Sequence, residues 1–433
     1  MNARSTLRVL AAALALGAAT AGPAAAAIQH EFSGSFTAQF VLSNFNNTAV
    51  TKDFAYNPDG LPADPGTASF FEQRVRLGYA AKFDERLKFV SKFEIDYAYY
   101  GDSSYDVGAN HGAAVGADQI NLETKNLYLD YTCPITGVNA KIGMQEYVDA
   151  FEGALIWADA AGLTLSRPFG ASTLSLGIFR LYDTGDVPGK KTADLFTLDG
   201  RYRLGETGTI GAAYYLVIDN TGDDSITVHT LGVNAKAALG AATLNGYLLG
   251  QFGDAGDGRS IGAFAGNLGA ETRVGTGTAR AEFQYASGDD KPNDKKVSNL
   301  LTFYGEYWYG SHNLALLTRD DLGLTADNGV IYDVGFAGRG SMIASAGYDL
   351  PLGPKTALSC NLGAGWAAKD AGRPGAALGT EANVKLTRQV YDALTLTVRA
   401  AYLFLGSFYD GAAANGADPD DPWDARIVLA YSF

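Results

Sequence analysis

The sequence has few of the residues that most catalytic and metal-binding sites require. Its 433 residues include two cysteines, four histidines and three methionines. None of the histidines lies near a convincing serine or aspartate partner, and no phosphate-binding loop, Cys/His metal cluster or haem-attachment motif is found. We therefore expect no enzyme activity, no metal site and no cofactor. No stretch reaches about 18 continuous apolar residues, which excludes a membrane-spanning helix.

The N-terminus indicates the compartment. Arg4 and Arg8 precede an apolar run over residues 9–21, and an alanine-rich segment follows at 24–27. A basic start, a short apolar run and small residues at a cleavage site are typical of a secretory signal peptide. We expect residues 1–27 to be removed and residues 28–433 to form one domain. The net charge of the whole chain is −14, and an acidic protein of this kind is not expected to bind nucleic acid.

From residue 29 onward, apolar and polar residues alternate in segments of about ten residues, a pattern typical of transmembrane β-strands. Residues 69–83 place aromatic and aliphatic side chains on one face and Arg74 and Arg76 on the other. Residues 87–100 repeat the pattern, with Tyr99 on the apolar face. The chain closes on "DARIVLAYSF", whose odd-numbered positions are all apolar. We expect tyrosines at the strand ends to form an aromatic girdle.

The connections predict the number of strands. Eight short turns alternate with long loops rich in glycine and aspartate, and an outer-membrane barrel has short turns at one end and long loops at the other. The sequence therefore predicts an all-β, up-and-down antiparallel transmembrane barrel of 18 strands. If residues 310–312 formed a ninth turn, the number would be 20, and 16 is the lower bound. The two cysteines, Cys133 and Cys360, would lie far apart, and we expect them to be unpaired.

A barrel of 16–18 strands encloses an aqueous channel. The inward-facing positions hold more basic than acidic residues, and basic rings favour anions. Cross-strand ion pairing offers the simpler explanation for these charges. The basic residues predicted to line the pore are Arg74, Arg76, Lys92, Lys141, Arg201, Arg280, Lys385 and Arg399.

The stretch 145–162 is less polar than the other predicted loops, because it contains four large apolar side chains. An exposed loop has no need of such residues, so we interpret it as a loop that folds into the pore. The alternative is an apolar lid on the rim of the barrel. The polar and aromatic residues predicted at the constriction are Asp149, Glu152, Trp157 and Asp159.

Two stretches carry a resemblance to a known family. They are "KIGMQ" (141–145), which leads to "ALIWADAAGLTLS", and "FYGEYW" (303–308). The chain resembles a Gram-negative outer-membrane porin over its mature length, and more narrowly the 18-stranded alginate-export-type channels. In that family the first stretch carries Gly-Arg-Gln, whereas Met144 replaces the arginine here. The resemblance implies an electropositive conduit in the cell outer membrane.

These observations favour a passive outer-membrane channel for small hydrophilic solutes with a preference for anions. One alternative is a specific exporter of an anionic polymer such as a polysaccharide. Another is a barrel sheath around a multihaem cytochrome, which requires a lumen without constricting loops. The expected partners are outer-membrane lipid, lipopolysaccharide and the solutes themselves, and the sequence leaves a homo-oligomer open.

Overall fold

The computed structural model describes residues 28–45, 53–102, 113–115, 122–291, 294–303, 312–319, 322 and 329–433, with the side chains of 96–98 excepted. The predicted signal peptide, most of the stretch 303–308 and the side chain of Tyr97 lie outside these residues. The signal peptide therefore stays a prediction. Within the described residues, no helix combines the length and the apolar character needed to cross a bilayer.

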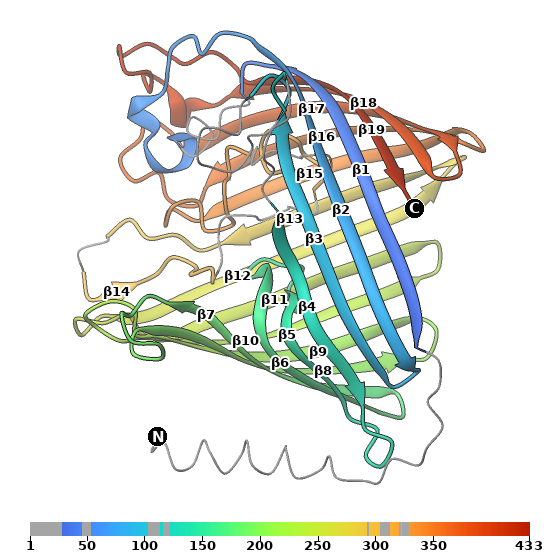
Figure 1. The fold of residues 1–433 in the computed structure, drawn as a ribbon. Coiled ribbons are helices and arrows are strands. Elements are labelled where there is room, and N and C mark those ends of the chain that lie inside the picture. Colours follow the sequence, from blue (N-terminus) through green and yellow to red (C-terminus); the bar gives the residue numbers. More distant parts are fainter. Residues whose placement is uncertain are drawn as a thin grey trace.

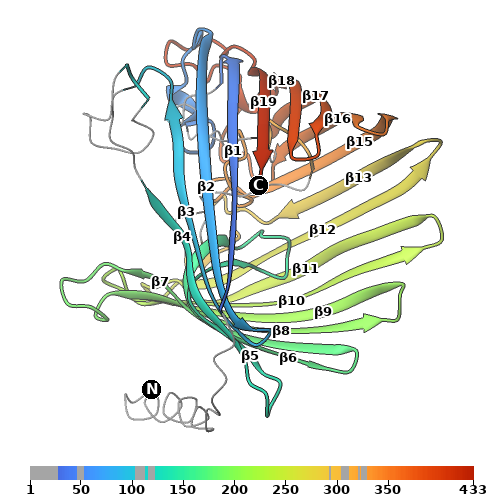
Figure 2. The same cartoon turned by 45° about the vertical axis from the view of Figure 1, so that its right-hand side comes forward.

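Eighteen antiparallel strands close into a barrel, as the sequence predicts (Figures 1 and 2). Each strand pairs with its neighbours in the chain, and β1 pairs with both β2 and β19, which closes the ring. The two-residue β14 (Lys296–Val297) lies beside β12 outside the ring order. The barrel strands are β1 (Gln29–Ser43), β2 (Ala68–Asp84), β3 (Leu87–Tyr99), β4 (Glu123–Thr132), β5 (Asn139–Val148), β6 (Trp157–Phe169), β7 (Ser172–Asp183), β8 (Thr192–Leu204), β9 (Gly208–Asp219), β10 (Ile226–Leu239), β11 (Ala242–Asp254), β12 (Ser260–Val274), β13 (Gly277–Ala286), β15 (Ser341–Gly353), β16 (Thr356–Ala367), β17 (Ala377–Tyr391), β18 (Leu394–Leu405) and β19 (Trp423–Ser432).

The two faces of the wall differ in the way that the alternation predicts. Along β10, Leu231 is 58% exposed on the outer face, whereas its neighbour Thr230 is fully buried on the inner face. An apolar face that remains exposed on a closed barrel is the surface that hydrocarbon covers, because lipid requires no polar partner from the side chains. The outer face of the barrel is therefore its membrane-facing surface.

The prediction for Tyr99 is wrong. Tyr99 pairs with Glu72, whose side chain faces the lumen, and the outer position beside Phe71 is taken by Tyr100, whose ring stacks on the Phe71 ring at a centroid distance of 5.7 Å. The cause is a register shift in the β2–β3 ladder between Gln73 and Val75. A bulge inserts one residue into one strand, so every later side chain on that strand changes face.

The C-terminal segment completes the ring. The backbone N–H of Phe433 donates to the carbonyl oxygen of Gly34 at 3.0 Å, and the Gly34 N–H donates to the Phe433 carbonyl at 2.9 Å. The Phe433 ring stacks on Tyr431 on the outer face, with a centroid distance of 5.7 Å. These contacts leave the last residue paired with β1, and they place both rings where aromatic girdles lie in outer-membrane barrels.

Several loops fold into the barrel and form an internal apolar core. The Phe151 side chain is fully buried, and a Cβ added to Gly232, on the inner face of β10, would lie 2.6 Å from its ring. Leu314 and Leu317 pack in the same way against Gly363 and Gly365 of β16. The alternative ninth turn at 310–312 falls mostly outside the described residues; within them, His312 is buried against Gln284 and Ser345 on the inner wall.

The first prediction tests which medium covers the outer face. Replacing exposed Leu231 by arginine should destabilise the barrel by about 2–4 kcal/mol if the residue lies near the bilayer midplane. The same replacement at an exposed leucine in water is usually neutral within about 0.5 kcal/mol. Denaturant unfolding in lipid vesicles measures the difference in the free energy of unfolding. The matched control is Asn234→Arg, on the inner face of the same strand, and an equal cost at both positions would contradict the assignment of faces.

A basic cluster on the inner wall

The candidate site lies where two neighbouring ladders are irregular within a few residues of each other along β3. The β2–β3 ladder shifts between Gln73 and Val75, and the β3–β4 ladder shifts between Lys92 and Phe93, which leaves Lys125 without an opposite residue. Bulges of this kind redirect side chains and are common beside functional sites. Here they gather the charged side chains of three strands around one buried carboxylate.

Glu94 is the centre of this cluster and is 3% exposed. Its Oε2 lies 3.6 Å from Arg74 Nε and accepts a hydrogen bond from Arg76 Nε, and its Oε1 lies 3.8 Å from Lys125 Nζ. A buried carboxylate is strongly destabilising unless cations and hydrogen bonds compensate it. Three cations therefore compensate this one carboxylate. We call Arg74, Arg76, Lys92, Glu94 and Lys125 the basic cluster.

Lys92 and Lys125 extend the cluster toward β5 and β6. Lys92 lies close enough to Arg76 and Lys125 for mutual repulsion and is attracted by Glu146 and Asp159. Lys125 Nζ also lies 2.9 Å from Asp159 Oδ2. The sequence predicts Arg74, Arg76 and Lys92 as lining residues, and the structure brings these three together. Lys125 was not predicted, because nothing in the alternation of apolar residues reveals the bulge that places it here.

Two other predicted lining residues form a second group. Lys385, Arg399 and Arg426 occupy opposing positions on β17, β18 and β19. Arg399 and Arg426 both donate to the carboxylate of Asp424. The side chains of Arg399, Arg426 and Asp424 are almost completely buried. Arg399 and Arg426 are therefore ion-paired within the wall, in agreement with the simpler explanation that wall charges pair across strands.

The remaining predicted lining residues lie apart from both groups. Arg280 donates to Asp349 at 2.7 and 2.9 Å and to Asn361 at 2.9 Å. The Lys141 ammonium lies 5.6 Å from the centre of the Tyr128 ring. Arg201 lies beside a hollow of about 240 Å³ on the inner wall, which Lys236, Glu152 and Glu271 also line.

The predicted constriction loop is shorter than expected, since β5 continues to Val148 and β6 begins at Trp157. Residues 149–156 form the loop, and Phe151 packs inside the barrel against the rings of Tyr215 and Tyr247. Asp149 anchors the loop: its carboxylate accepts hydrogen bonds at 2.7–3.1 Å from the backbone N–H groups of Phe151, Gly153, Leu155 and Ile156. This carboxylate stabilises the loop and does not face the pore.

The other three residues predicted at the constriction lie in different places. Glu152 faces the inner wall and accepts a hydrogen bond from Asn245 at 2.8 Å. Trp157 and Asp159 belong to β6, on the outer face, where Trp157 is 39% exposed and donates to Glu146 at 3.0 Å. We expected Trp157 and Asp159 to project into the pore, but both lie on the outer face. The reason is that β6 already begins at Trp157, so both residues pair with β5 and are not part of the loop.

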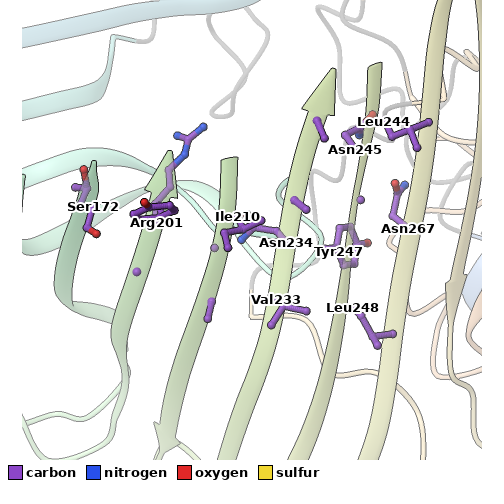
Figure 3. A pocket seen from close by; sticks show the side chains of 18 of the residues that line it. Ser172, Arg201, Ile210, Val233, Asn234, Leu244, Asn245, Tyr247, Leu248 and Asn267 are labelled. Carbon is purple, nitrogen blue, oxygen red and sulfur yellow. The ribbon is translucent and has the colours of Figure 1, made fainter. Parts of the chain in front are cut away.

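A larger hollow of about 980 Å³ lies over β7–β12 (Figure 3). Its exposed lining comes from outward-facing residues such as Tyr202, Val233, Leu248 and Leu268, and the small residue Gly246 lies between them. The hollow is a groove in the membrane-facing surface. None of the residues that line it belongs to the basic cluster.

Comparison with known proteins places the fold. No family model and no curated relative matches the chain. Solved structures match over nearly the whole length. OccK11 (OpdR) of Pseudomonas aeruginosa is 16% identical to this chain, with a TM-score of 0.53. The match covers 93% of this chain and 96% of the OccK11 chain. The chain has the fold of the outer-membrane porins.

Two further porin structures illustrate the likeness. OccK2 (OpdF) of Pseudomonas aeruginosa, solved in complex with glucuronate, is 15% identical, with a TM-score of 0.54 and coverage of 94% and 98%. A BenF-like porin from Pseudomonas fluorescens Pf-5 is 13% identical, with a TM-score of 0.55 and the same coverage. At these identities the likeness concerns the porin fold. The narrower resemblance to alginate-export-type channels stays a prediction.

The second prediction concerns the anchor of the internal loop. In Asp149→Ala four backbone N–H groups lose their acceptor, and a hydrogen bond to a charged group contributes about 1.5–3 kcal/mol. The loop 149–156 should leave the inner wall, which raises single-channel conductance and its fluctuations. Asp186→Ala, in an exposed loop, is the matched control and should leave both unchanged. Equal conductance of the Asp149→Ala variant and the unmodified protein would contradict this role.

The third prediction concerns pH. Burial raises the pKa of the Asp149 carboxyl to about 6, although four backbone hydrogen bonds oppose the shift. Because the pKa in the folded protein exceeds that in the unfolded chain, the folded state binds more protons between about pH 4 and pH 6, and stability falls as the pH rises through this range. Denaturant midpoints at several pH values should show this fall, and Asp149→Asn should weaken it. An unchanged pH dependence in the variant would assign the effect to other groups.

Proposed function

We propose that this porin-fold protein is an outer-membrane channel for passive diffusion of small hydrophilic solutes and that it favours anions. The basic cluster carries the proposal. Arg74, Arg76 and Lys125 lie within 4 Å of the buried carboxylate of Glu94 on the inner wall, and Lys92 lies near Arg76 and Lys125. The side chains of Arg76 and Lys125 are 33% and 26% exposed, whereas those of Arg399 and Arg426, beside Asp424, are each 2% exposed.

Charge at this place acts on a solute at short range. The Debye length is about 8 Å at physiological ionic strength, so a wall charge affects ions that pass within roughly that distance. A low-dielectric protein wall focuses the field further. Rings of arginine and lysine favour anions in membrane pores for this reason.

The similar structures support the same class of solute. They are porins, and one was solved with glucuronate, a small sugar acid. Guanidinium groups bind carboxylates through paired hydrogen bonds, and Arg74 and Arg76 lie two positions apart on one face of β2. We therefore propose that small carboxylates are among the favoured solutes.

The internal loops bear on the alternatives. A sheath for a multihaem cytochrome requires an open lumen, but Phe151, Leu314 and Leu317 pack on the inner wall and occupy part of it. This arrangement disfavours the sheath. Export of an anionic polymer stays a prediction from the sequence, since no contact among the described residues favours it over diffusion of small solutes.

The fourth prediction uses two variants of the cluster with opposite expected effects. Arg76→Gln combined with Lys92→Gln removes two cations and should move the reversal potential in a KCl gradient toward that of a cation-selective pore. Glu94→Gln removes the central carboxylate and should move it toward that of an anion-selective pore. Single-channel recording of the refolded protein in planar bilayers measures both.

The control for these recordings is Arg86→Gln, in the turn between β2 and β3, which should leave the selectivity unchanged. Shifts in the same direction for both cluster variants would show that altered folding, and not charge, determines the result. No conductance from the correctly folded, unmodified barrel would overturn the proposed channel function.

A further inference from the structure

The wall of the barrel has one short ladder. β4 and β5 each contain ten residues but pair at six positions, from Thr132 opposite Asn139 to Leu127 opposite Met144. Beyond this point Glu123, Thr124 and Asn126 pair with β3, and residues 145–148 pair with β6. Among the described residues no rung joins these two edges. We call residues 123–126, together with Lys92 and Arg76 beside them, the inner lip of the seam, and residues 145–148, together with Trp157 opposite Val148, the outer lip.

The seam extends into the apolar part of the membrane. Six rungs at about 3.4 Å each cover about 20 Å along the strands, which a tilt of about 45° reduces to roughly 14 Å of height. The apolar band of an outer-membrane barrel is about 25 Å high. Backbone groups at that depth need partners, because hydrocarbon offers none. A ladder that stops early at this level is therefore costly and calls for an explanation.

The two lips overlap, so that the inner face of one meets the outer face of the other. Asn126 lies opposite Lys92 on the lumen side of the wall, whereas Asp159 lies on the outer face of β6. Even so, Asn126 Nδ2 donates to Asp159 Oδ1 at 2.8 Å, and Lys125 Nζ lies 2.9 Å from Asp159 Oδ2. Side chains from the lumen face can reach the outer face only where the wall between them is open.

The sequence encodes the separation of the two strands. Gly143 has a φ of +128°, and a Cβ at this position would lie 2.2 Å from the Leu127 carbonyl oxygen. Only glycine adopts this conformation without strain, and glycines inside strands commonly mark bulges and bends. The ladder ends one residue after Gly143, at Met144, and the bulge at Lys125 bends the facing strand at the same level.

We propose that the seam is a lateral portal between the lumen and the membrane, and that Lys125, Asn126 and Asp159 form its latch. Separation of the latch frees the Lys125 ammonium beside Lys92 and Arg76, which form a cationic surface on the inner lip. The outer lip presents Val148 and Trp157, which are 41% and 39% exposed to the membrane.

An amphipathic carboxylate fits this arrangement. Its anionic head pairs with the lysines of the inner lip, while its apolar chain stays in the bilayer beside Val148 and Trp157. The fatty acids are the simplest members of this class. The portal is a second route in the wall, distinct from the axial passage of hydrophilic solutes.

The experiment uses a diazirine-bearing palmitate in vesicles that contain the refolded protein, with labelled positions located by mass spectrometry. In a background of Cys133→Ser and Cys360→Ser, the pair Asn126→Cys and Asp159→Cys closes the latch with a disulfide under oxidation. The matched control pair is Leu129→Cys and Ile142→Cys, which lie opposite each other in the intact part of the same ladder. A further variant, Asp159→Ala, removes the latch without a crosslink, and Asp186→Ala is its control.

We expect palmitate to label lumen-facing residues of β3 and β4, including the segment around Lys92. Most of this labelling should be lost when the latch is crosslinked, and it should increase in Asp159→Ala, with both controls unchanged. Axial conductance in KCl should persist in the crosslinked protein, which separates the portal from the proposed channel function. Equal labelling of the crosslinked and uncrosslinked proteins, or no increase in Asp159→Ala, would overturn the portal.

Discussion

The structure depends on one constraint: inside hydrocarbon every backbone N–H and C=O group must find its partner within the protein. Strands can meet this requirement only by closing into a ring, and the pairing of β1 with β19 achieves it. Closure fixes the two faces of the wall, because a slip of one residue would exchange them. Apolar side chains such as Leu231 then meet lipid, and charged side chains such as Arg74 meet the lumen.

The same constraint explains how irregular backbone is accommodated inside the barrel. The loop 149–156 donates four backbone N–H groups to the Asp149 carboxylate, and residues 315–317 donate three to Glu381 on β17. A carboxylate with two oxygens accepts several such bonds at once, so a single acidic side chain stabilises a whole turn. Asp149, which the sequence analysis assigns to the constriction, and Glu381 thus act as anchors for the internal loops.

The alternation of apolar residues predicted the barrel and the inward direction of Arg74 and Arg76, because these follow from a period of two along unbroken ladders, and the eight short turns predicted the strand number. It failed for Tyr99 and Lys125, where a bulge changes the face of the chain without changing its composition. It also failed for Trp157, since an aromatic residue at a strand end resembles an apolar residue in a loop. The local alternation of residues predicts the regular parts of the barrel wall. The residues at bulges depend on the register between strands, which the local sequence does not reveal.

These exceptions coincide. The bulge that brings Lys125 beside Glu94 lies two residues from Leu127, whose pairing with Met144 ends the β4–β5 ladder next to Gly143. A regular ladder offers alternate positions to each face and cannot place so many cations beside one carboxylate. A strand that bends to bring Lys125 inward also turns away from its neighbour, and the edge it leaves must be closed by side chains. The basic cluster and the seam are therefore two results of the same departure from regular pairing.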